Sequence, residues 1–264
     1  MAIQATLDRL RLVLVSARNP LNIGAAARAM SNFGCRHLRV VNPYEASFRE
    51  ARSAVGASDV LAAAEEFKTV AEAVADCTLV VGTTAVRHRD LQHTVRRLED
   101  GARLIRKRLA SSRVALLFGS EKFGLSNDDM SHCHWLLRIP THEQNISMNL
   151  GQAAAVCLYE LIRDGKTIGP PKSGGARPPN SGGKNEALAS AAEVERFTEV
   201  LLENLFASGY LTRRRVADAE LRIRRLVRRL NLPARDAVIW VGIMRQLLWK
   251  MRSGQAVADG QGKT

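Results

Sequence analysis

Short apolar runs alternate with helical stripes along the first 165 residues of the chain. Runs rich in aliphatic and β-branched residues predict strands at residues 11–15, 37–41, 78–81, 114–118 and 135–139. Helical patterns lie between them at residues 22–33, 69–75, 98–109 and 148–162. Strands that alternate with helices are typical of an α/β fold with a mostly parallel sheet flanked by helices.

The pattern changes after residue 165. Residues 166–185 contain paired prolines and paired glycines and no long apolar run, which predicts a flexible linker. Three further helical stripes follow, within residues 194–205, 216–230 and 241–251. We therefore expect a main domain at 1–165, a linker at 166–185 and a basic helical module at 186–264. A helical module of this size has only marginal stability by itself, so we expect it to pack on the main domain or on a second subunit.

Charge points to a polyanionic partner. The 264 residues carry a net charge of +13, for which nucleic acid is the default candidate and an acidic membrane surface the weaker one. Of the 39 Lys and Arg, 18 lie at or after Lys166, against 9 of the 26 Asp and Glu, so this stretch carries +9. Eight arginines gather in or near the second stripe of the module: Arg213, Arg214, Arg215, Arg222, Arg224, Arg225, Arg228 and Arg229. We favour RNA phosphate contacts over a merely solvated polar face, since a run of one sign repels itself.

Several classes of protein are disfavoured. No apolar stretch reaches the ~20 residues that span a bilayer, and the first ten residues lack a signal-peptide core, so we expect a cytoplasmic protein without membrane contact. The four cysteines are widely spaced and should be reduced and mostly buried. The P-loop, the dinucleotide-binding glycine pattern and the hydrolase elbow are missing. No metal is expected at residues 132–134, because alternate residues of a strand point to opposite faces.

Three polar runs lie where predicted strands end or predicted helices begin, which is where parallel α/β domains carry their chemistry. The first run spans residues 19–28. Asn22 is a plausible helix cap, and Gly24 would let another backbone come close. A capped alanine-rich helix explains these two residues but not the charge of Arg28 among alanines.

The second and third runs follow the strands predicted at 114–118 and 135–139. Gly119, Glu121 and Gly124 permit a tight turn and place a carboxylate, which if buried could accept hydrogen bonds or pair with Arg28. An ordinary loop carboxylate is the alternative. In the third run, Ser147 or Asn149 could cap the following helix. A helix amino end also offers free N–H groups to a phosphate or carboxylate.

In this order, the three runs resemble the motifs of the SPOUT RNA methyltransferases, in the SpoU/TrmH branch. The resemblance implies transfer of a methyl group from S-adenosylmethionine to a ribose 2′-hydroxyl, with S-adenosylhomocysteine as product. It also implies a C-terminal trefoil knot in the sheet domain and a homodimer with sites at the subunit interface. The linker and tail are similar to those of the branch members that methylate nucleotide 32 of the tRNA anticodon loop. Ribosomal RNA, another tRNA position, or a catalytically silent knotted RNA-binding protein are the alternatives.

The resemblance also implies roles for individual residues. The cofactor would be held by Thr83, Thr84, Ala85, Gly119, Ile139, Ile146, Ser147 and Met148. The catalytic set would be Arg28, Asn22, Glu121, Ser147 and Asn149, and a silent binder would not need all five. Arg28 would act as a base if its pKa were strongly lowered, or would stabilise the developing alkoxide, which we favour. The asparagines would orient Arg28 and the RNA, Ser147 would hold a phosphate or ribose, and Glu121 would brace the arginine. RNA phosphates would be contacted by Arg28, Arg224, Arg225, Arg228 and Arg229.

Overall fold

The computed structural model describes residues 7–44, 48, 59–85, 92–163, 187–211 and 216–261. The chain divides into two compact units, Met1–Ser181 and Gly182–Thr264. The expected linker at 166–185 lies outside the described residues, as do Arg213, Arg214 and Arg215. The domain boundaries at 165 and 185 therefore stay predictions.

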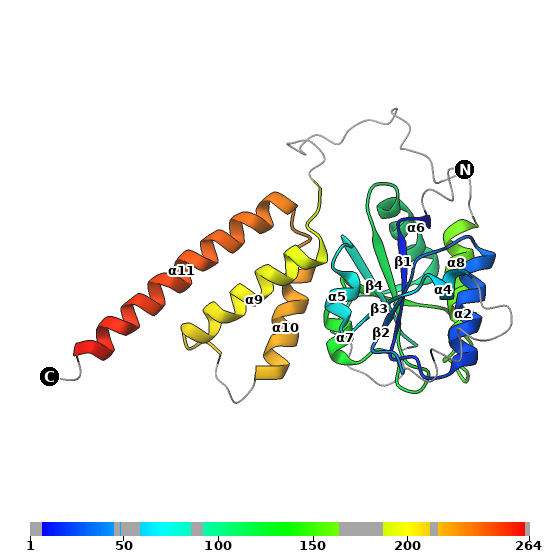
Figure 1. The fold of residues 1–264 in the computed structure, drawn as a ribbon, viewed down its shortest axis with the longest axis horizontal. Helices are drawn as coiled ribbons and strands as arrows, with labels where there is room; N and C mark the ends of the chain where they lie inside the picture. Colours follow the sequence, from blue (N-terminus) through cyan, green and yellow to red (C-terminus); the bar gives the residue numbers. More distant parts are fainter. Residues whose placement is uncertain are drawn as a thin grey trace, which may run out of the picture. The chain divides into compact units, whose positions relative to one another are not determined.

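The first unit is built on a seven-stranded sheet in the order β3-β2-β1-β6-β4-β7-β5, in which every pair is parallel (Figure 1). The strands are β1 (Leu10–Val15), β2 (Leu38–Val41), β3 (Glu65–Phe67), β4 (Leu79–Thr83), β5 (Val95–Arg97), β6 (Val114–Phe118) and β7 (Trp135–Arg138). The predicted α/β fold with a parallel sheet is confirmed. The trefoil knot remains an implication of the family resemblance.

Helices cover both faces of this sheet. They are α2 (Pro20–Asn32), α4 (Asp59–Ala62), α5 (Val70–Val74), α6 (Leu98–Leu109), α7 (Asn127–Ser131) and α8 (Leu150–Ile162). Figure 1 shows α2, α4 and α8 together on one side and α5 and α7 on the other. The extensive contact between α2 and α8 brings the first and third sequence motifs together.

The central strands are buried along their whole length, as expected for a parallel sheet with helices on both faces. This burial explains why their continuous apolar runs are readable in the sequence. The edge strands β3 and β5 were not predicted. Their residues are mostly charged and exposed, and so carry no apolar signal.

The cysteines behave as predicted. Cys35, Cys77, Cys133 and Cys157 are all free and buried. Burial raises the pKa of the Cys35, Cys77 and Cys157 thiols to about 12, so these three stay protonated and unreactive near neutral pH.

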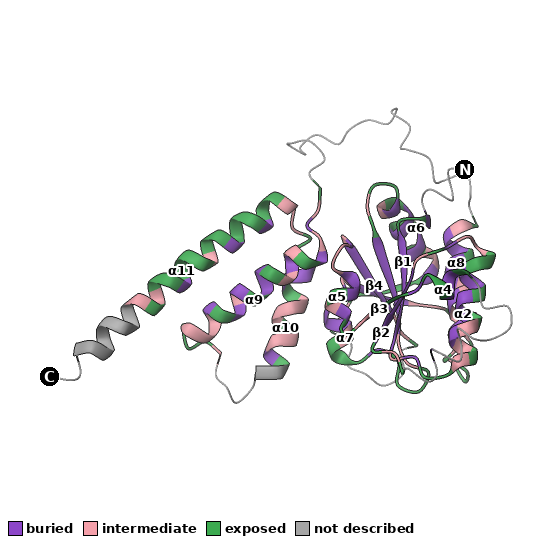
Figure 2. Ribbon diagram, in the orientation of Figure 1, coloured by how far each residue is buried: buried purple, intermediate pink, exposed green. Residues whose placement is uncertain are grey.

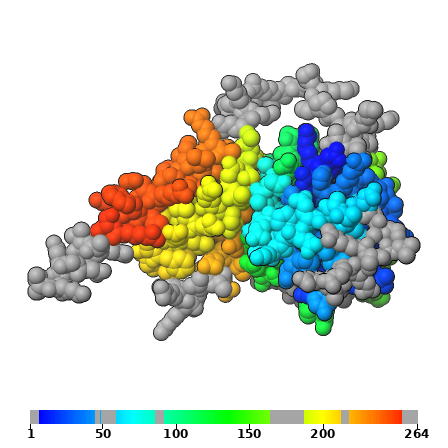
Figure 3. Space-filling view, viewed as in Figure 1, coloured from blue at the N-terminus to red at the C-terminus, as the bar shows by residue number. Residues whose placement is uncertain are grey.

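The second unit consists of α9 (Ala191–Ala207), α10 (Val216–Arg229) and α11 (Ala234–Gln261). Ser190 and Glu193 form a capping box that starts α9. Figure 3 shows the surfaces of α9 and α11 side by side, and these two helices make the most extensive contact among the described helices of the unit. The small core of the unit, to which all three helices contribute, is Ala189, Val194, Phe197, Val227, Ala237 and Val241. Much of α11 remains exposed (Figure 2).

Within the described part of the chain, no helix is both long and apolar enough to cross a bilayer.

Candidate active site

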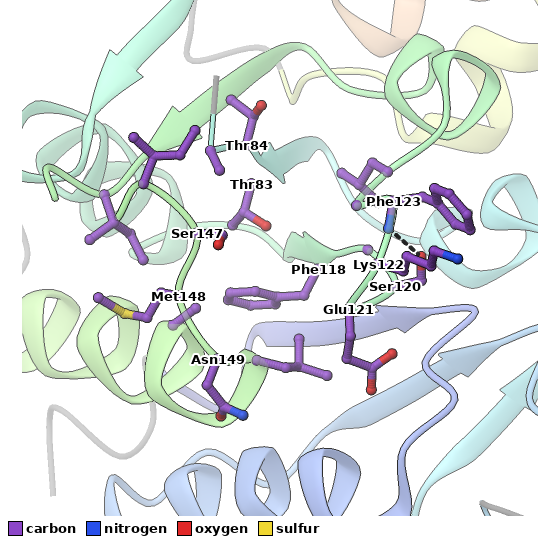
Figure 4. A pocket seen from close by; sticks show the side chains of 18 of the residues that line it. Thr83, Thr84, Phe118, Ser120, Glu121, Lys122, Phe123, Ser147, Met148 and Asn149 are labelled. Carbon is purple, nitrogen blue, oxygen red and sulfur yellow. Dashed lines mark hydrogen bonds between the residues drawn. The ribbon is translucent and has the colours of Figure 1, made fainter. Parts of the chain in front are cut away.

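A cavity of about 630 Å³ opens at the carboxyl ends of β4, β6 and β7, beside the amino end of α8 (Figure 4). This volume lies within the range of small-molecule sites. All eight residues that the family resemblance assigned to the cofactor line it: Thr83, Thr84, Ala85, Gly119, Ile139, Ile146, Ser147 and Met148. The structure thus brings together residues from three loops, while the role of each remains a prediction.

Hydrogen bonds hold the loops of the cavity in place. The hydroxyl of Thr83 donates to the carbonyl of Leu117 at 2.9 Å, which ties the end of β4 to β6. The hydroxyl of Thr141 donates to the carbonyl of Ile146 at 3.2 Å, which closes the loop between β7 and α8. The cavity is lined by both apolar and polar side chains of these loops, so its wall suits a nucleoside-like ligand.

Gly119 is needed for a close approach of two backbone segments. A Cβ at this position would collide with the backbone of Gly124 and Leu125. The turn after β6 can therefore fold back on the strand only if residue 119 is glycine. This confirms the expectation of a tight turn at the end of this strand.

The amino end of α8 is capped as predicted. The Asn149 side-chain oxygen accepts hydrogen bonds from the backbone N–H groups of Gly151 at 2.9 Å and Gln152 at 3.4 Å. Asn149 therefore fixes the start of the helix at the edge of the cavity.

The cap of α2 is Asn19, and the expectation that Asn22 caps this helix is wrong. The Asn19 side chain accepts from the Leu21 N–H at 2.9 Å, and Pro20 occupies the first helical position. Proline is common at this position, because it has no N–H to leave unsatisfied there. The pair Asn19-Pro20 was therefore the signal in the sequence that marks the true start of the helix. Asn22 lies one turn inside, where its side chain is available for other partners.

Those partners form a relay across all three motifs. The Asn22 side-chain nitrogen donates to Glu121 Oε1 at 3.2 Å. The Asn22 side-chain oxygen accepts from the Asn149 side-chain nitrogen at 2.7 Å. Asn22, Glu121 and Asn149 also line the cavity, so the relay forms part of its wall.

Glu121 is exposed rather than buried, and of its two expected roles it accepts hydrogen bonds, from the loop before α2, and does not pair with Arg28. Its carboxylate accepts from the backbone N–H groups of Arg18 at 3.2 Å and Asn19 at 3.1 Å. Desolvation alone would raise its pKa, but these hydrogen bonds, with those from its own backbone and from Asn22, outweigh it and hold the pKa of Glu121 below the ordinary value. The carboxylate therefore stays ionised near neutral pH and fixes the β1–α2 loop.

Arg28 lies on the exposed surface of α2, outside the residues that line the cavity. Among the described residues, no hydrogen bond or ion pair joins it to Glu121. The expected pairing fails because Arg28 is almost two helical turns beyond Asn22, whereas Glu121 contacts the start of the helix. A single chain thus assembles four of the five predicted catalytic residues and leaves the fifth apart.

The close backbone approach expected at Gly24 occurs elsewhere. A Cβ at Gly24 would meet no described atom within 4 Å. A Cβ at Gly151 would lie 2.5 Å from the Ala25 side chain. The tight crossing of α2 and α8 therefore depends on Gly151.

The arginines of α10 fall into two groups. Arg228 is only 1% exposed, and its guanidinium binds the Ala191 carbonyl at 3.3 Å and Glu195 at 2.9 Å. Arg224 pairs with the same carboxylate at 2.9 Å. Their contacts join α10 to α9, so the structure does not bring these two guanidinium groups to a free surface.

Arg229 is exposed, and Arg225 is half-buried. Burial lowers the pKa of Arg225, and the neighbouring charges of Arg222 and Arg229 lower it further. Arg222, Arg225 and Arg229 are three and four residues apart, so they share one side of α10. Arg222 was not in the predicted RNA-binding set.

The sequence profile of the SpoU rRNA Methylase family matches residues 9–159. The chain is 32% identical over 246 residues to the tRNA (cytidine/uridine/adenosine-2′-O-)-methyltransferase TrmJ of Pseudomonas aeruginosa (strain UCBPP-PA14), covering 91% of this chain and 94% of that protein. It is 31% identical to the tRNA (cytidine/uridine-2′-O-)-methyltransferase TrmJ of Sodalis glossinidius (strain morsitans), covering 91% and 92%. The crystal structure of TrmJ from Z. mobilis ZM4 matches with a TM-score of 0.73 and 31% identity, covering 90% of this chain and 98% of that one.

Proposed function

Because the chain belongs to the SpoU rRNA Methylase family, we propose that it is an S-adenosylmethionine-dependent methyltransferase that acts on a ribose 2′-hydroxyl of tRNA. The observation that carries the proposal is the relay of Glu121, Asn22 and Asn149 at the wall of the cavity. It unites the three motifs that the family shares. The relatives from Pseudomonas aeruginosa and Sodalis glossinidius, which each match nine-tenths of this chain, are named as tRNA 2′-O-methyltransferases.

The cavity fits the cofactor in size and in lining. Thr83, Thr84 and Ala85 would hold it from the end of β4, Gly119 from β6, and Ile139, Ile146, Ser147 and Met148 from the loop between β7 and α8. When bound, S-adenosylmethionine supplies an electrophilic methyl group and leaves as S-adenosylhomocysteine. Backbone groups at the strand ends would fix its orientation, and the apolar side chains would keep water from the transferred methyl.

The remaining residues would align the ribose. Asn149 and Asn22 are held in one orientation by each other and by Glu121, so their positions are set before RNA arrives. Ser147 is exposed at the amino end of α8, where its hydroxyl can reach a ribose or phosphate oxygen. Preset polar groups of this kind lower the cost of arranging the attacking hydroxyl.

Arg28 would stabilise the alkoxide that develops on the 2′-oxygen and hold the adjacent phosphate. Its exposure favours this electrostatic role over that of a general base. Since Arg28 lies outside the cavity of its own chain, it would act on a second one. A symmetric homodimer meets this need, because the Arg28 of each subunit can then reach the cavity of the other subunit.

A face of α2 is suited to such a dimer. Leu21 is 80% exposed, Ala25 and Arg28 are exposed along the same side, and Gly24 leaves open space beside them. A second copy packed here would cover an apolar side chain. It would also bring the partner subunit's Arg28 toward the relay.

The target we propose is nucleotide 32 of the anticodon loop, and tRNA as substrate would place the enzyme in the cytoplasm. Arg225 and Arg229 on α10 would contribute phosphate contacts. Arg224 and Arg228 would instead hold that helix against α9.

Methyl transfer from radiolabelled S-adenosylmethionine to tRNA transcripts tests the proposal. We expect incorporation into a transcript with ribose at nucleotide 32 and none when that sugar is 2′-deoxyribose. Incorporation into both would move the target elsewhere in the tRNA. Cofactor binding by calorimetry without transfer to any tRNA or ribosomal RNA would contradict the activity.

A further inference from the structure

Two exposed aromatic rings, each beside a cation, lie on the loops that Glu121 connects. The Arg18 guanidinium carbon is 5.4 Å from the ring centre of Tyr44. The Lys122 ammonium nitrogen is 5.2 Å from the ring centre of Phe123. Glu121 joins the two pairs, because its carboxylate binds the Arg18 N–H and its own backbone continues into Lys122.

The position of Phe123 is built by a closed turn. The Gly124 N–H donates to the Ser120 carbonyl at 2.8 Å, and the Phe123 N–H donates to the Ser120 hydroxyl at 3.4 Å (Figure 4). Gly124 has φ of +68°, a conformation that favours glycine and lets the turn close. The turn therefore presents Lys122 and Phe123 at its tip. In Figure 4 these two residues and Ser120 lie together at one side of the cavity.

Both rings are largely open to solvent. Phe123 is 69% exposed and Tyr44 is 52% exposed. Single exposed apolar side chains are ordinary on protein surfaces, but here two exposed rings each lie beside a cation, which favours contact with another molecule. Lys122 and Phe123 also line the cavity, which puts this contact next to the proposed methyl-transfer site.

We propose that Tyr44 and Phe123, with Arg18 and Lys122, form a stacking platform for the unpaired bases that flank the methylated nucleotide. This inference rests on the proposed function and identifies the feature of the substrate, a single-stranded loop, that the first unit would recognise. Unpaired bases stack on aromatic rings whatever their sequence, and a cation beside each ring can meet the adjacent phosphate. The platform would hold the loop on both sides of the target ribose.

The charges favour RNA over a second copy of this chain as the occupant. Lysine is depleted at the centre of protein–protein interfaces, and here Lys122 accompanies the more exposed of the two rings. Two like charges facing their own counterparts in a symmetric dimer would repel each other. The same charges facing phosphates would attract.

The test pairs protein variants with RNA lacking single bases. A tRNA anticodon stem-loop is compared with the same RNA carrying an abasic ribose on one side or the other of the target nucleotide. Binding is measured for the full-length parent, for Phe123→Leu and for Tyr44→Leu. We expect each variant to bind the intact loop about tenfold more weakly, as loss of one base–aromatic stack implies.

The decisive result is whether the loss of an aromatic ring and the loss of a base weaken binding independently or through the same contact. One abasic site should weaken binding to the parent about tenfold and weaken binding to the matching variant far less. Tyr159→Leu, which removes an exposed ring from α8 away from these loops, should leave the full abasic penalty in place.

An equal abasic penalty in the parent and in both variants would overturn the platform. So would a shift of Phe123→Leu to a smaller species in sedimentation together with an unchanged abasic penalty, because that pair of results marks the ring as a dimer contact. The comparison is read from binding alone. A failure of the parent to methylate any tRNA would count against the proposed function and not against the platform.

Discussion

The side chain of Asn149 donates a hydrogen bond of 2.7 Å to the side chain of Asn22, which lies 127 residues earlier in the chain. The same Asn149 caps α8, and the same Asn22 binds Glu121. One contact thus couples the starts of α2 and α8 to the loop after β6. The geometry of the proposed site depends on this contact.

Replacing Asn22 by aspartate should break the relay with little change in side-chain volume. An aspartate cannot donate to Glu121 and places a second carboxylate beside it. We expect methyl transfer to fall about tenfold or more, since a hydrogen bond to a charged group is lost and repulsion is gained. Asn127→Asp, at an exposed position in the first turn of α7, is the matched control. Steady-state rates of both variants decide the matter, and equal rates would contradict a role for the relay.

Arg28→Ala should lower methyl transfer about 100-fold or more and leave the affinity for S-adenosylmethionine unchanged, because Arg28 lies outside the cavity. Single-turnover rates and calorimetry measure the two quantities. A rate within tenfold of the parent would contradict the assigned role.

The dimer can be tested by mixing two inactive proteins. Arg28→Ala and Ser147→Ala homodimers should each be inactive. After exchange of subunits in equal amounts, half of the dimers carry one intact site, so about a quarter of the parent activity should return. Mixtures that stay inactive, despite exchange shown by mass spectrometry, would mean that Arg28 serves its own chain.

Gly151→Ala should separate α2 from α8, because the new Cβ would lie 2.5 Å from the Ala25 side chain. We expect a loss of roughly 1–3 kcal/mol in the free energy of unfolding of the first unit. Gly242→Ala in α11 is the control, since its Cβ would meet no described atom within 4 Å. That change should stabilise its helix by roughly 0.5–1 kcal/mol. Urea unfolding measures both, and a neutral effect of Gly151→Ala would show that the helices can move apart at no cost.

The three arginines that share one side of α10 should act as phosphate contacts. The triple variant Arg222→Gln, Arg225→Gln and Arg229→Gln keeps helix propensity and removes three charges. If all three reach phosphates, the slope of log affinity against log salt should fall by about 2–3. The measurement is tRNA binding across a salt series. An unchanged slope would mean that these three arginines face solvent and do not contact phosphates.

The pair that binds Glu195 should behave differently. Arg228→Gln with Arg224→Gln leaves Glu195 without its two ion-pair partners on α10. We expect the second unit to lose about 3 kcal/mol of stability, while the salt slope of the folded protein stays that of the parent. Thermal unfolding and the same salt series separate the two effects. A lowered slope without loss of stability would place these guanidinium groups on RNA after all.

Asp76 should account for part of the acid sensitivity of the first unit. Desolvation would raise its pKa, but hydrogen bonding and attraction to Arg39 outweigh this, with a contribution from Arg11, and lower the pKa to about 2. Because the folded pKa is below the ordinary value near 4, the stabilisation is present above pH 4 and is lost as pH falls toward 2.

Asp76→Asn should therefore cost about 1–2 kcal/mol near neutral pH, after allowance for solvent screening, and the difference from the parent should shrink between pH 4 and 2. Asp8→Asn, an exposed carboxyl, is the control. Urea unfolding at a series of pH values tests this. A difference that persists at pH 2 would assign the effect to packing rather than charge.

Periodicity predicted the central sheet because its strands are buried on both faces. The strand β6 and the helix α6 have the predicted bounds, and Thr69 caps α5 where a helix was expected to begin. The edges were harder to predict. Glu65 and Glu66 form a strand because β2 offers them backbone partners, and no local apolar pattern announces such pairing.

The candidate site was predictable as a set of loops and unpredictable as a set of contacts. Four of the five predicted catalytic residues line the cavity, since motifs at the carboxyl ends of parallel strands converge at one edge of the sheet. Which atom binds which was beyond the sequence. From the sequence alone, the Glu121 carboxylate could bind either Arg28 or the loop before α2. The folded backbone places it at the loop, where it accepts hydrogen bonds from Arg18 and Asn19.

The sequence by itself determined the family, the parallel sheet, the helices of the second unit and the excess of positive charge. Only the tertiary structure decided that Arg28 lies outside its own cavity, and that Arg228 is buried while its neighbour Arg229 is exposed. The spacing of residues along a helix gives their positions around the helix axis, but it does not show which side becomes buried. The side that becomes the interior depends on where another segment packs, and here a carboxylate 33 residues away, Glu195, draws Arg228 inward.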